Sequence, residues 1–166
     1  MSVAMKSNLK IDAHQHFWQP LRGDYAWMPQ DNLILNRAYR PSDLKPSLER
    51  HGIDGTVVVQ AAASVGETEY LLGLADATHY IKGVVGWIDL KSPKIEYKLD
   101  EFQKNEKFVG VRHVWHDEKD ESWIINPEVI RGLKALSIRN INFDFLVRPN
   151  HLKYIHNVYD EIPDLN

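Results

Sequence analysis

The sequence at residues 9–17 is LKIDAHQHF, and this stretch separates two common ways of building a parallel α/β sheet. Its residues alternate, with Asp12, His14 and His16 on one side and mainly apolar residues on the other, which predicts a strand. The strand is not followed by the glycine-rich phosphate-binding turn of a doubly wound sheet. A long aromatic loop at residues 18–40 follows instead. This order favours a barrel, in which ligands bind at the carboxyl ends of the strands.

Four further apolar runs of strand length follow the first, and stretches with helical spacing separate them. The runs lie at residues 55–62, 81–90, 108–116 and 141–147. Prolines and capping residues indicate where helices begin: Pro41, Ser64 with Glu67 as a capping box, Pro93, Asn126 with Pro127, and Asn150. Five strands alternating with five helices predict an α/β fold with a parallel sheet. Residues 1–166 are expected to form a single domain.

The composition is that of a globular protein, and it argues against several classes of partner and site. The 166 residues are 43% hydrophobic and 26% charged, with a formal net charge of −3. This charge gives no electrostatic reason to expect nucleic acid or an anionic membrane as a partner. No apolar run approaches the roughly 20 residues of a membrane span, so a cytoplasmic location is expected. The sequence contains no cysteine, which excludes disulfides and thiolate metal sites.

His14 and His16 are the most informative candidates for chemistry. Residues i and i+2 of a strand point to the same face, so both imidazoles are predicted to face the mouth of the barrel. Two imidazoles that converge there can ligate a divalent metal or contact a polarised substrate oxygen. The alternative is a pair of solvated side chains at a strand end. Asp12 before the pair and the aromatic loop after it favour the functional interpretation.

Arg112 and His113 are neighbours in the fourth predicted strand. Because adjacent strand residues point to opposite faces, only one of the two is expected to face the barrel interior. A buried arginine needs a partner, so a role in the site is favoured for Arg112. The histidines on or beside the predicted helices are interpreted as surface residues: His51, His79, His151 and His156.

Four more side chains are candidates for substrate binding, and each has a structural alternative. Gln60 ends the second predicted strand and can hydrogen-bond a ligand. Asp89 ends the third strand and either contacts a sugar hydroxyl or caps the following helix. Asp144 lies between two phenylalanines in the fifth strand, either in the site or in a structural ion pair. Trp27 lies in the first loop with Trp18 and Tyr25, and these rings either stack on a sugar or cap the pocket, or else pack the loop onto the barrel.

Several of these motifs together resemble a known family. The similar stretches are residues 11–18, residues 24–27, residues 58–61, residues 86–90, residues 110–113, and Phe143-Asp144 followed by Arg148-Pro149. They resemble the amidohydrolase-related (amidohydrolase family 2) sugar lactonases, which include L-fuconolactonases and L-rhamnonolactonases. The similarity extends over essentially the whole sequence.

The resemblance implies a TIM (β/α)8 barrel that hydrolyses a sugar lactone to its aldonic acid, with this chain covering about the first five βα units. His14 and His16 match the histidine pair of the family's first strand, and they would ligate a divalent metal such as zinc if one is bound. Members differ in whether they need a metal. Arg112 matches an arginine expected near the lactone carbonyl. His113 is expected to contact the substrate.

The family's water-activating base is an aspartate at the end of the last strand, and its motif does not occur in this sequence. The resemblance therefore implies that the isolated chain hydrolyses sugar lactones poorly or not at all. Two alternatives stay open. One is a metal-dependent decarboxylase of the same superfamily, although residues 14–18 and 25–27 favour a lactonase. The other is an inactive fragment or an assembly partner, which activity measurements on the purified chain would distinguish.

Five strands of a barrel leave two open sheet edges, at the first and the fifth strand. Apolar side chains such as those of Ile11 and Phe143 would then be partly exposed. Contiguous apolar surface of several hundred Å² is rare on a soluble monomer. We therefore expect the isolated chain to be marginally stable, to self-associate through these edges, or to need the missing part of the barrel from another chain.

Overall fold

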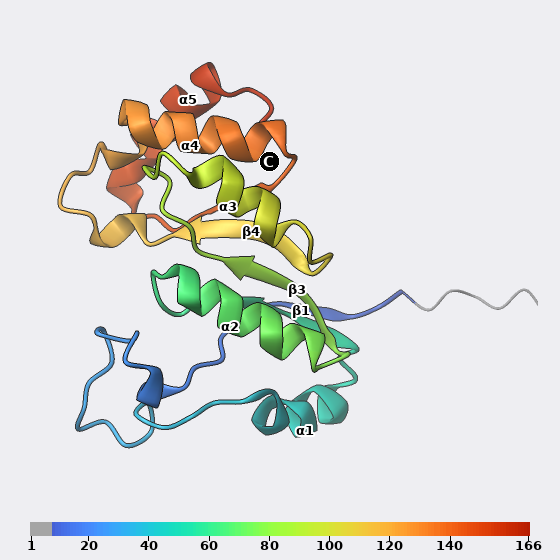
Figure 1. Ribbon diagram of the computed structural model, residues 1–166. Helices are drawn as coiled ribbons and strands as arrows, with labels where there is room; N and C mark the ends of the chain where they lie inside the picture. The colour runs from blue at the N-terminus through green and yellow to red at the C-terminus, as the bar shows by residue number, and fades with distance from the viewer. Residues whose placement is uncertain (1–7) are drawn as a thin grey trace, which may run out of the picture.

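A computed structural model describes residues 8–166, in which five parallel strands alternate with helices. Figure 1 shows how these elements are arranged. The strands are β1 (Ile11–Gln15), β2 (Gly55–Val59), β3 (Ile81–Gly86), β4 (Phe108–His113) and β5 (Asn142–Phe145). The helices are α1 (Pro41–His51), α2 (Val65–Asp76), α3 (Ile95–Phe102), α4 (Pro127–Ile138) and α5 (Leu152–Glu161). Short 3-10 turns lie at Pro20–Arg22, Trp115–Asp117, Trp123–Ile125 and Pro149–His151.

The order of the strands in space is β1-β2-β3-β4-β5, the same as their order along the chain. Every neighbouring pair is parallel. In a doubly wound sheet, the order of the strands reverses at a switch point, and the first strand lies in the middle of the sheet. In Figure 1 the helices follow one another in the same order, from α1 at the bottom to α5 at the top. The fold is therefore half of an α/β barrel, as the sequence predicts.

Local signals in the sequence explain where the helices begin and end. Pro41 occupies the first turn of α1, and Gly52 ends that helix with a φ of +62°, a left-handed conformation that glycine adopts without strain. The Asn126 side chain caps α4 by accepting from the backbone N–H of Glu128. These predicted boundaries are confirmed to within one or two residues.

The core fills the space between the sheet and the helices that cover it. Strands β2, β3 and β4 are buried along most of their length, as expected for a parallel sheet covered on its outer face. Large apolar side chains with almost no exposure complete the core: Leu71, Ile81, Ile88, Leu90, Ile95, Leu99, Leu133 and Leu136. No helix within residues 8–166 is both long and apolar enough to cross a bilayer.

The two outer strands differ from the inner ones. Strand β1 pairs only with β2 among the described strands, and Ile11 is 37% exposed. Strand β5 pairs with β4, and on its other side the Phe143 N–H donates to the carbonyl of Asn166 at 2.7 Å. Phe143 itself is buried. Self-association through these edges stays a prediction.

Candidate active site at the carboxyl ends of the strands

The two histidines of the first strand converge on one point. His14 lies in β1 and His16 directly after it, and their Nε2 atoms are 3.2 Å apart. The Nδ1 atom of His16 lies 2.8 Å from the carbonyl oxygen of Val59. Because a carbonyl only accepts, His16 Nδ1 carries the hydrogen, and its Nε2 keeps a free electron pair. Burial lowers the pKa of His16. The bond to Val59 opposes this shift, and the positive charge of Arg112 adds to it.

Arg112 approaches the same pair from strand β4. One guanidinium nitrogen lies 3.3 Å from His14 Nε2, and the other donates to the carbonyl of Gln60 at 2.6 Å. In return, the side chain of Gln60 donates to the carbonyl of Arg112 at 3.3 Å. Strand β3 lies between the strands that carry these two residues. These two hydrogen bonds therefore join the end of β2, which Gln60 directly follows, to β4.

No protonation state of His14 satisfies both contacts of its Nε2 atom, the one with His16 and the one with Arg112. If His14 Nε2 is protonated, it donates to His16, and a donor of Arg112 then faces another donor. If it is unprotonated, it accepts from Arg112, and two imidazole electron pairs face each other across 3.2 Å. In the second state, the pair presents two nitrogen ligands to the same space.

The groups around Arg112 are buried and only partly paired. Gln60 is 0% exposed and Arg112 is 8% exposed. The Oε1 atom of Gln60 and the Nε atom of Arg112 are buried without a hydrogen-bond partner. Asp144 is the register partner of Arg112 on β5, so the two side chains share a face of the sheet. Burial lowers the pKa of Arg112, and the charge of Asp144 opposes this effect.

A cavity of about 550 Å³ lies above these strand ends. Its walls include His16 and Arg112, the loop residues Trp18 and Trp27, and the turn after β2 at residues 60–63. Larger depressions of about 800 and 730 Å³ lie among the outer helices, but they contain none of the predicted site residues. We assign the site to the smaller cavity because the converging polar groups lie there.

His113 is held at the rim of the cavity in one tautomer. The indole N–H of Trp87 donates to its Nδ1 at 3.2 Å, so its Nε2 carries the hydrogen and donates to Glu118 at 2.8 Å. The imidazole stacks on Trp123 with 3.9 Å between ring centroids. Burial lowers the pKa of His113, and Glu118 opposes the shift. His113 is thus a neutral imidazole at neutral pH.

This environment predicts a pH dependence of stability. Because the pKa of His113 is lower in the folded state than its usual 6.5, its contribution to stability is present above pH 6.5 and is lost as the pH falls through the folded-state pKa. Asp89 and Glu118 attract the cationic form and Lys91 repels it. The His113→Gln variant should lose less stability than the wild type between pH 6.5 and pH 5, measured by chemical denaturation. An equal loss in both proteins would contradict this prediction.

Some of the remaining predicted residues line the cavity and others do not. The indole N–H of Trp27 donates to the carbonyl of Ala61 at 2.7 Å, and its ring lines the cavity. Both Arg112 and His113 reach the cavity, Arg112 from the inner face of the sheet and His113 from the rim. Asp89 is exposed, and its carboxylate accepts from the N–H of Lys91 two residues later. That bond closes a turn ahead of α3, whose N-cap is Lys94, so Asp89 does not cap the following helix, and it does not line the cavity.

Two expectations from the sequence need correction. His151 is 3% exposed, although its place beside a helix predicted a surface residue. It packs on Trp115 and accepts from the N–H of Arg148. Glu67 was expected to complete a capping box with Ser64. The Ser64 hydroxyl does accept from the N–H of Glu67, but the carboxylate of Glu67 contacts Tyr25 and Ala61 instead.

Glu118 is a residue at the cavity that was not predicted from the sequence. It lines the cavity and holds His113. Glu118 lies in an irregular segment five residues after His113, so no periodicity indicated their contact. Trp18, a candidate from the aromatic first loop, also lines the cavity.

A divalent metal fits the histidine pair in part. Zinc binds imidazole nitrogen at about 2.0–2.1 Å, and two nitrogens 3.2 Å apart can both reach one such ion. Within residues 8–166, however, no group of three or more His, Cys, Asp or Glu side chains is placed to hold a metal. The described residues therefore supply two ligands.

Comparison with known proteins gives a consistent set of relatives. A family model described as amidohydrolase matches residues 11–166. An L-fucono-1,5-lactonase of Burkholderia ambifaria is 40% identical over 143 residues, which are 86% of this chain and 49% of that protein. An L-fucono-1,5-lactonase of Burkholderia multivorans is 35% identical over 140 residues, 84% of this chain and 47% of that protein. The chain spans about half the length of these relatives.

A solved structure shows the same fold. The crystal structure of an amidohydrolase from Burkholderia multivorans with bound zinc superimposes with a TM-score of 0.87 and 32% identity. The superposition covers 95% of this chain and 55% of that one.

Proposed function

Since the chain belongs to the amidohydrolase family, whose model matches residues 11–166, we propose that it carries the substrate-binding and electrophilic side of a site that hydrolyses a sugar lactone to its aldonic acid. L-Fucono-1,5-lactone is the substrate to try first, because two relatives carry that name. The convergence of His14, His16 and Arg112 at one end of the sheet is the observation that carries the proposal.

Hydrolysis of a lactone needs groups that stabilise negative charge on the carbonyl oxygen. Water adds to the carbonyl carbon, the bond to the ring oxygen breaks, and the ring oxygen takes up a proton to give a hydroxy acid. The guanidinium of Arg112 supplies fixed positive charge and an unpaired buried N–H for the developing oxyanion. Its bonds to His14 and to the Gln60 carbonyl orient it before the reaction begins.

A polyhydroxy ring also suits the unpaired acceptor at the site. Gln60 Oε1 is buried and has no donor, which costs free energy unless a ligand supplies one. A sugar hydroxyl would do so. Trp27, half-exposed at the cavity, offers a flat apolar surface to the C–H face of the ring. His113 and Asp144 are proposed as further partners for hydroxyl groups.

A divalent metal held by His14 and His16 would polarise the carbonyl or a water molecule when bound. Whatever the metal requirement, His16 is oriented by Val59 in the tautomer that exposes Nε2 to the ligand space. None of the residues assigned here acts as the general base for water. We therefore expect the 166-residue chain to turn over slowly, below about 1 per second.

Binding tests the proposal without depending on turnover. L-Fuconate, the hydrolysed lactone, is titrated into the protein by calorimetry and compared with hexanoate, which has the carboxylate but no hydroxyl groups. We expect L-fuconate to bind and hexanoate to bind at least tenfold more weakly, because a sugar acid supplies donors that Gln60 Oε1 lacks. Equal affinity for both acids, or no binding of L-fuconate, would contradict the proposed substrate class.

A further inference from the structure

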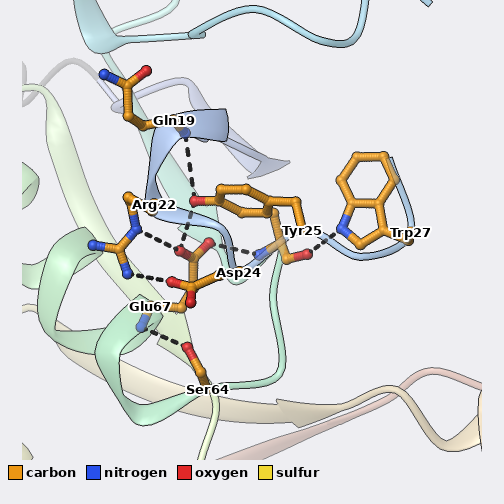
Figure 2. Close-up of polar contacts among 8 residues, drawn as sticks. Gln19, Arg22, Asp24, Tyr25, Trp27, Ser64 and Glu67 are labelled. Atoms are coloured by element: carbon orange, nitrogen blue, oxygen red, sulfur yellow. Dashed lines mark hydrogen bonds and ion pairs between the residues drawn. The ribbon is translucent and has the colours of Figure 1, made fainter. Parts of the chain in front are cut away.

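A second buried polar cluster lies beside the cavity and joins the first loop to helix α2 (Figure 2). Its centre is Glu67, a carboxylate with 0% exposure in the first turn of α2. Glu67 accepts from the hydroxyl of Tyr25 at 2.8 Å and from the backbone N–H of Ala61 at 3.1 Å. Tyr25 belongs to the loop and Ala61 to the turn after β2, so one carboxylate holds two segments together.

The cluster offsets the cost of burying this charge. The Nε atom of Arg22 lies 3.9 Å from Glu67, and another guanidinium nitrogen pairs with Asp24 at 2.6 Å. The same guanidinium lies 4.4 Å from the ring centre of Tyr70. Burial raises the pKa of Glu67, and the bond from Tyr25 opposes the shift. A glutamate that served only to cap the helix could stay in solvent and would not need these partners.

Both segments that Glu67 holds lead to Trp27. Tyr25 precedes Trp27 by two residues in the loop. Ala61 receives the indole N–H of Trp27 on its carbonyl, at 2.7 Å, while its own N–H goes to Glu67. The rings of Trp27 and Trp18 meet edge to face with 5.8 Å between centroids, and both line the cavity. Figure 2 shows Tyr25 between Glu67 and the turn that leads to Trp27.

We propose that Glu67 and Tyr25 form a latch that fixes Trp27 as the aromatic wall of the cavity, against which the ring of the substrate lies. The two are positioning residues, since neither lines the cavity. The role in substrate binding rests on the proposed function, whereas the placement of Trp27 does not. Without the latch, the indole bond to the Ala61 carbonyl would be left to hold Trp27 at the end of a long loop.

The Tyr25→Phe variant tests the latch in the full chain, because it removes the hydroxyl and keeps the ring. The measurement is hydrogen exchange of the Trp27 indole N–H by NMR. We expect exchange about tenfold faster than in the wild type, since one hydrogen bond to a charged group is lost. The Ala61 amide should stay protected, because its bond to Glu67 remains. Tyr97→Phe is the matched control: Tyr97 is 64% exposed on α3, and its exchange pattern should equal the wild type.

A second variant, Glu67→Gln, keeps the size of the side chain. Its amide has one acceptor oxygen instead of two, so it cannot accept from both Tyr25 and Ala61 as the carboxylate does. It should accelerate exchange at both the Trp27 indole and the Ala61 amide, and it should weaken L-fuconate binding several-fold. Unchanged indole exchange in both variants overturns the latch. Faster exchange with wild-type affinity for L-fuconate overturns its role in positioning the substrate. If the wild type fails to bind L-fuconate, the proposed function fails, and the exchange rates still decide the latch.

Discussion

The Arg112→Met variant is expected to lose about ten- to a hundredfold in affinity for L-fuconate and to be less stable than the wild type. Arg112 lines the cavity and carries a charge that is largely buried. A hydrogen bond to a charged group contributes about 1.5–3 kcal/mol, and each 1.4 kcal/mol is about a factor of ten in affinity. Methionine has a similar volume, but it leaves the Gln60 carbonyl without this donor and Asp144 without the opposing charge, and removing one partner of a buried contact lowers stability. Calorimetric titration and thermal unfolding of the same samples measure both effects.

Arg112→Lys is the matched control for charge. A lysine retains the positive charge, but a single ammonium cannot reproduce a planar fork that reaches both His14 and the Gln60 carbonyl. We expect it to bind L-fuconate more weakly than the wild type and more tightly than Arg112→Met. Wild-type affinity in Arg112→Met would show that the guanidinium does not contact the ligand.

The Gly132→Ala variant is expected to be destabilised by about 3 kcal/mol. Gly132 lies in α4 where the helix packs on the chain after β3, and a Cβ atom there would overlap the carbonyl oxygen of Leu90. The obstacle is a backbone atom, so relief requires the helix to move away from the core. Each kcal/mol shifts the midpoint of thermal unfolding by about 2–4 °C in a chain of this size.

Gly73→Ala provides the matched control for this substitution. Gly73 lies in α2 and is exposed, and nothing lies within 4 Å of the position of an added Cβ atom. Alanine should therefore stabilise α2 by about 0.5–1 kcal/mol through its better helix propensity. Equal stability of Gly132→Ala and Gly73→Ala would contradict the close packing of α4 on residue 90.

Regular periodicity accounts for the part of the site that could be predicted from the sequence. The alternation at residues 9–17 placed His14 and His16 on one face, and the order of the elements placed that face at the ligand-binding end. Gln60 was predicted from its position at the end of the second strand, and Arg112 because an arginine buried in the fourth strand needs a partner. These residues depend on backbone geometry alone, which repeats every two residues along a strand.

Contacts made by irregular segments could not be predicted in the same way. Glu118 reaches His113 through a turn whose path no pattern specifies. The pattern of Ser64 and Glu67 suggested a local cap, but the loop from residue 18 to residue 40 folds back and supplies Tyr25 as a competing donor. The long-range partner prevailed because it satisfies a fully buried carboxylate, which the helix end alone would leave short of donors.

We propose that the ends of β1, β2 and β4 form one site for a sugar acid or its lactone. Titration of L-fuconate into ¹⁵N-labelled protein, followed by NMR, tests whether these strand ends bind the ligand together. We predict that the largest shift changes fall on His16, Gln60 and Arg112 and on the indole of Trp27, with little change at residues 127–138 around the larger depression between the outer helices. Shift changes concentrated in α4 and α5, with none at the strand ends, would contradict the account.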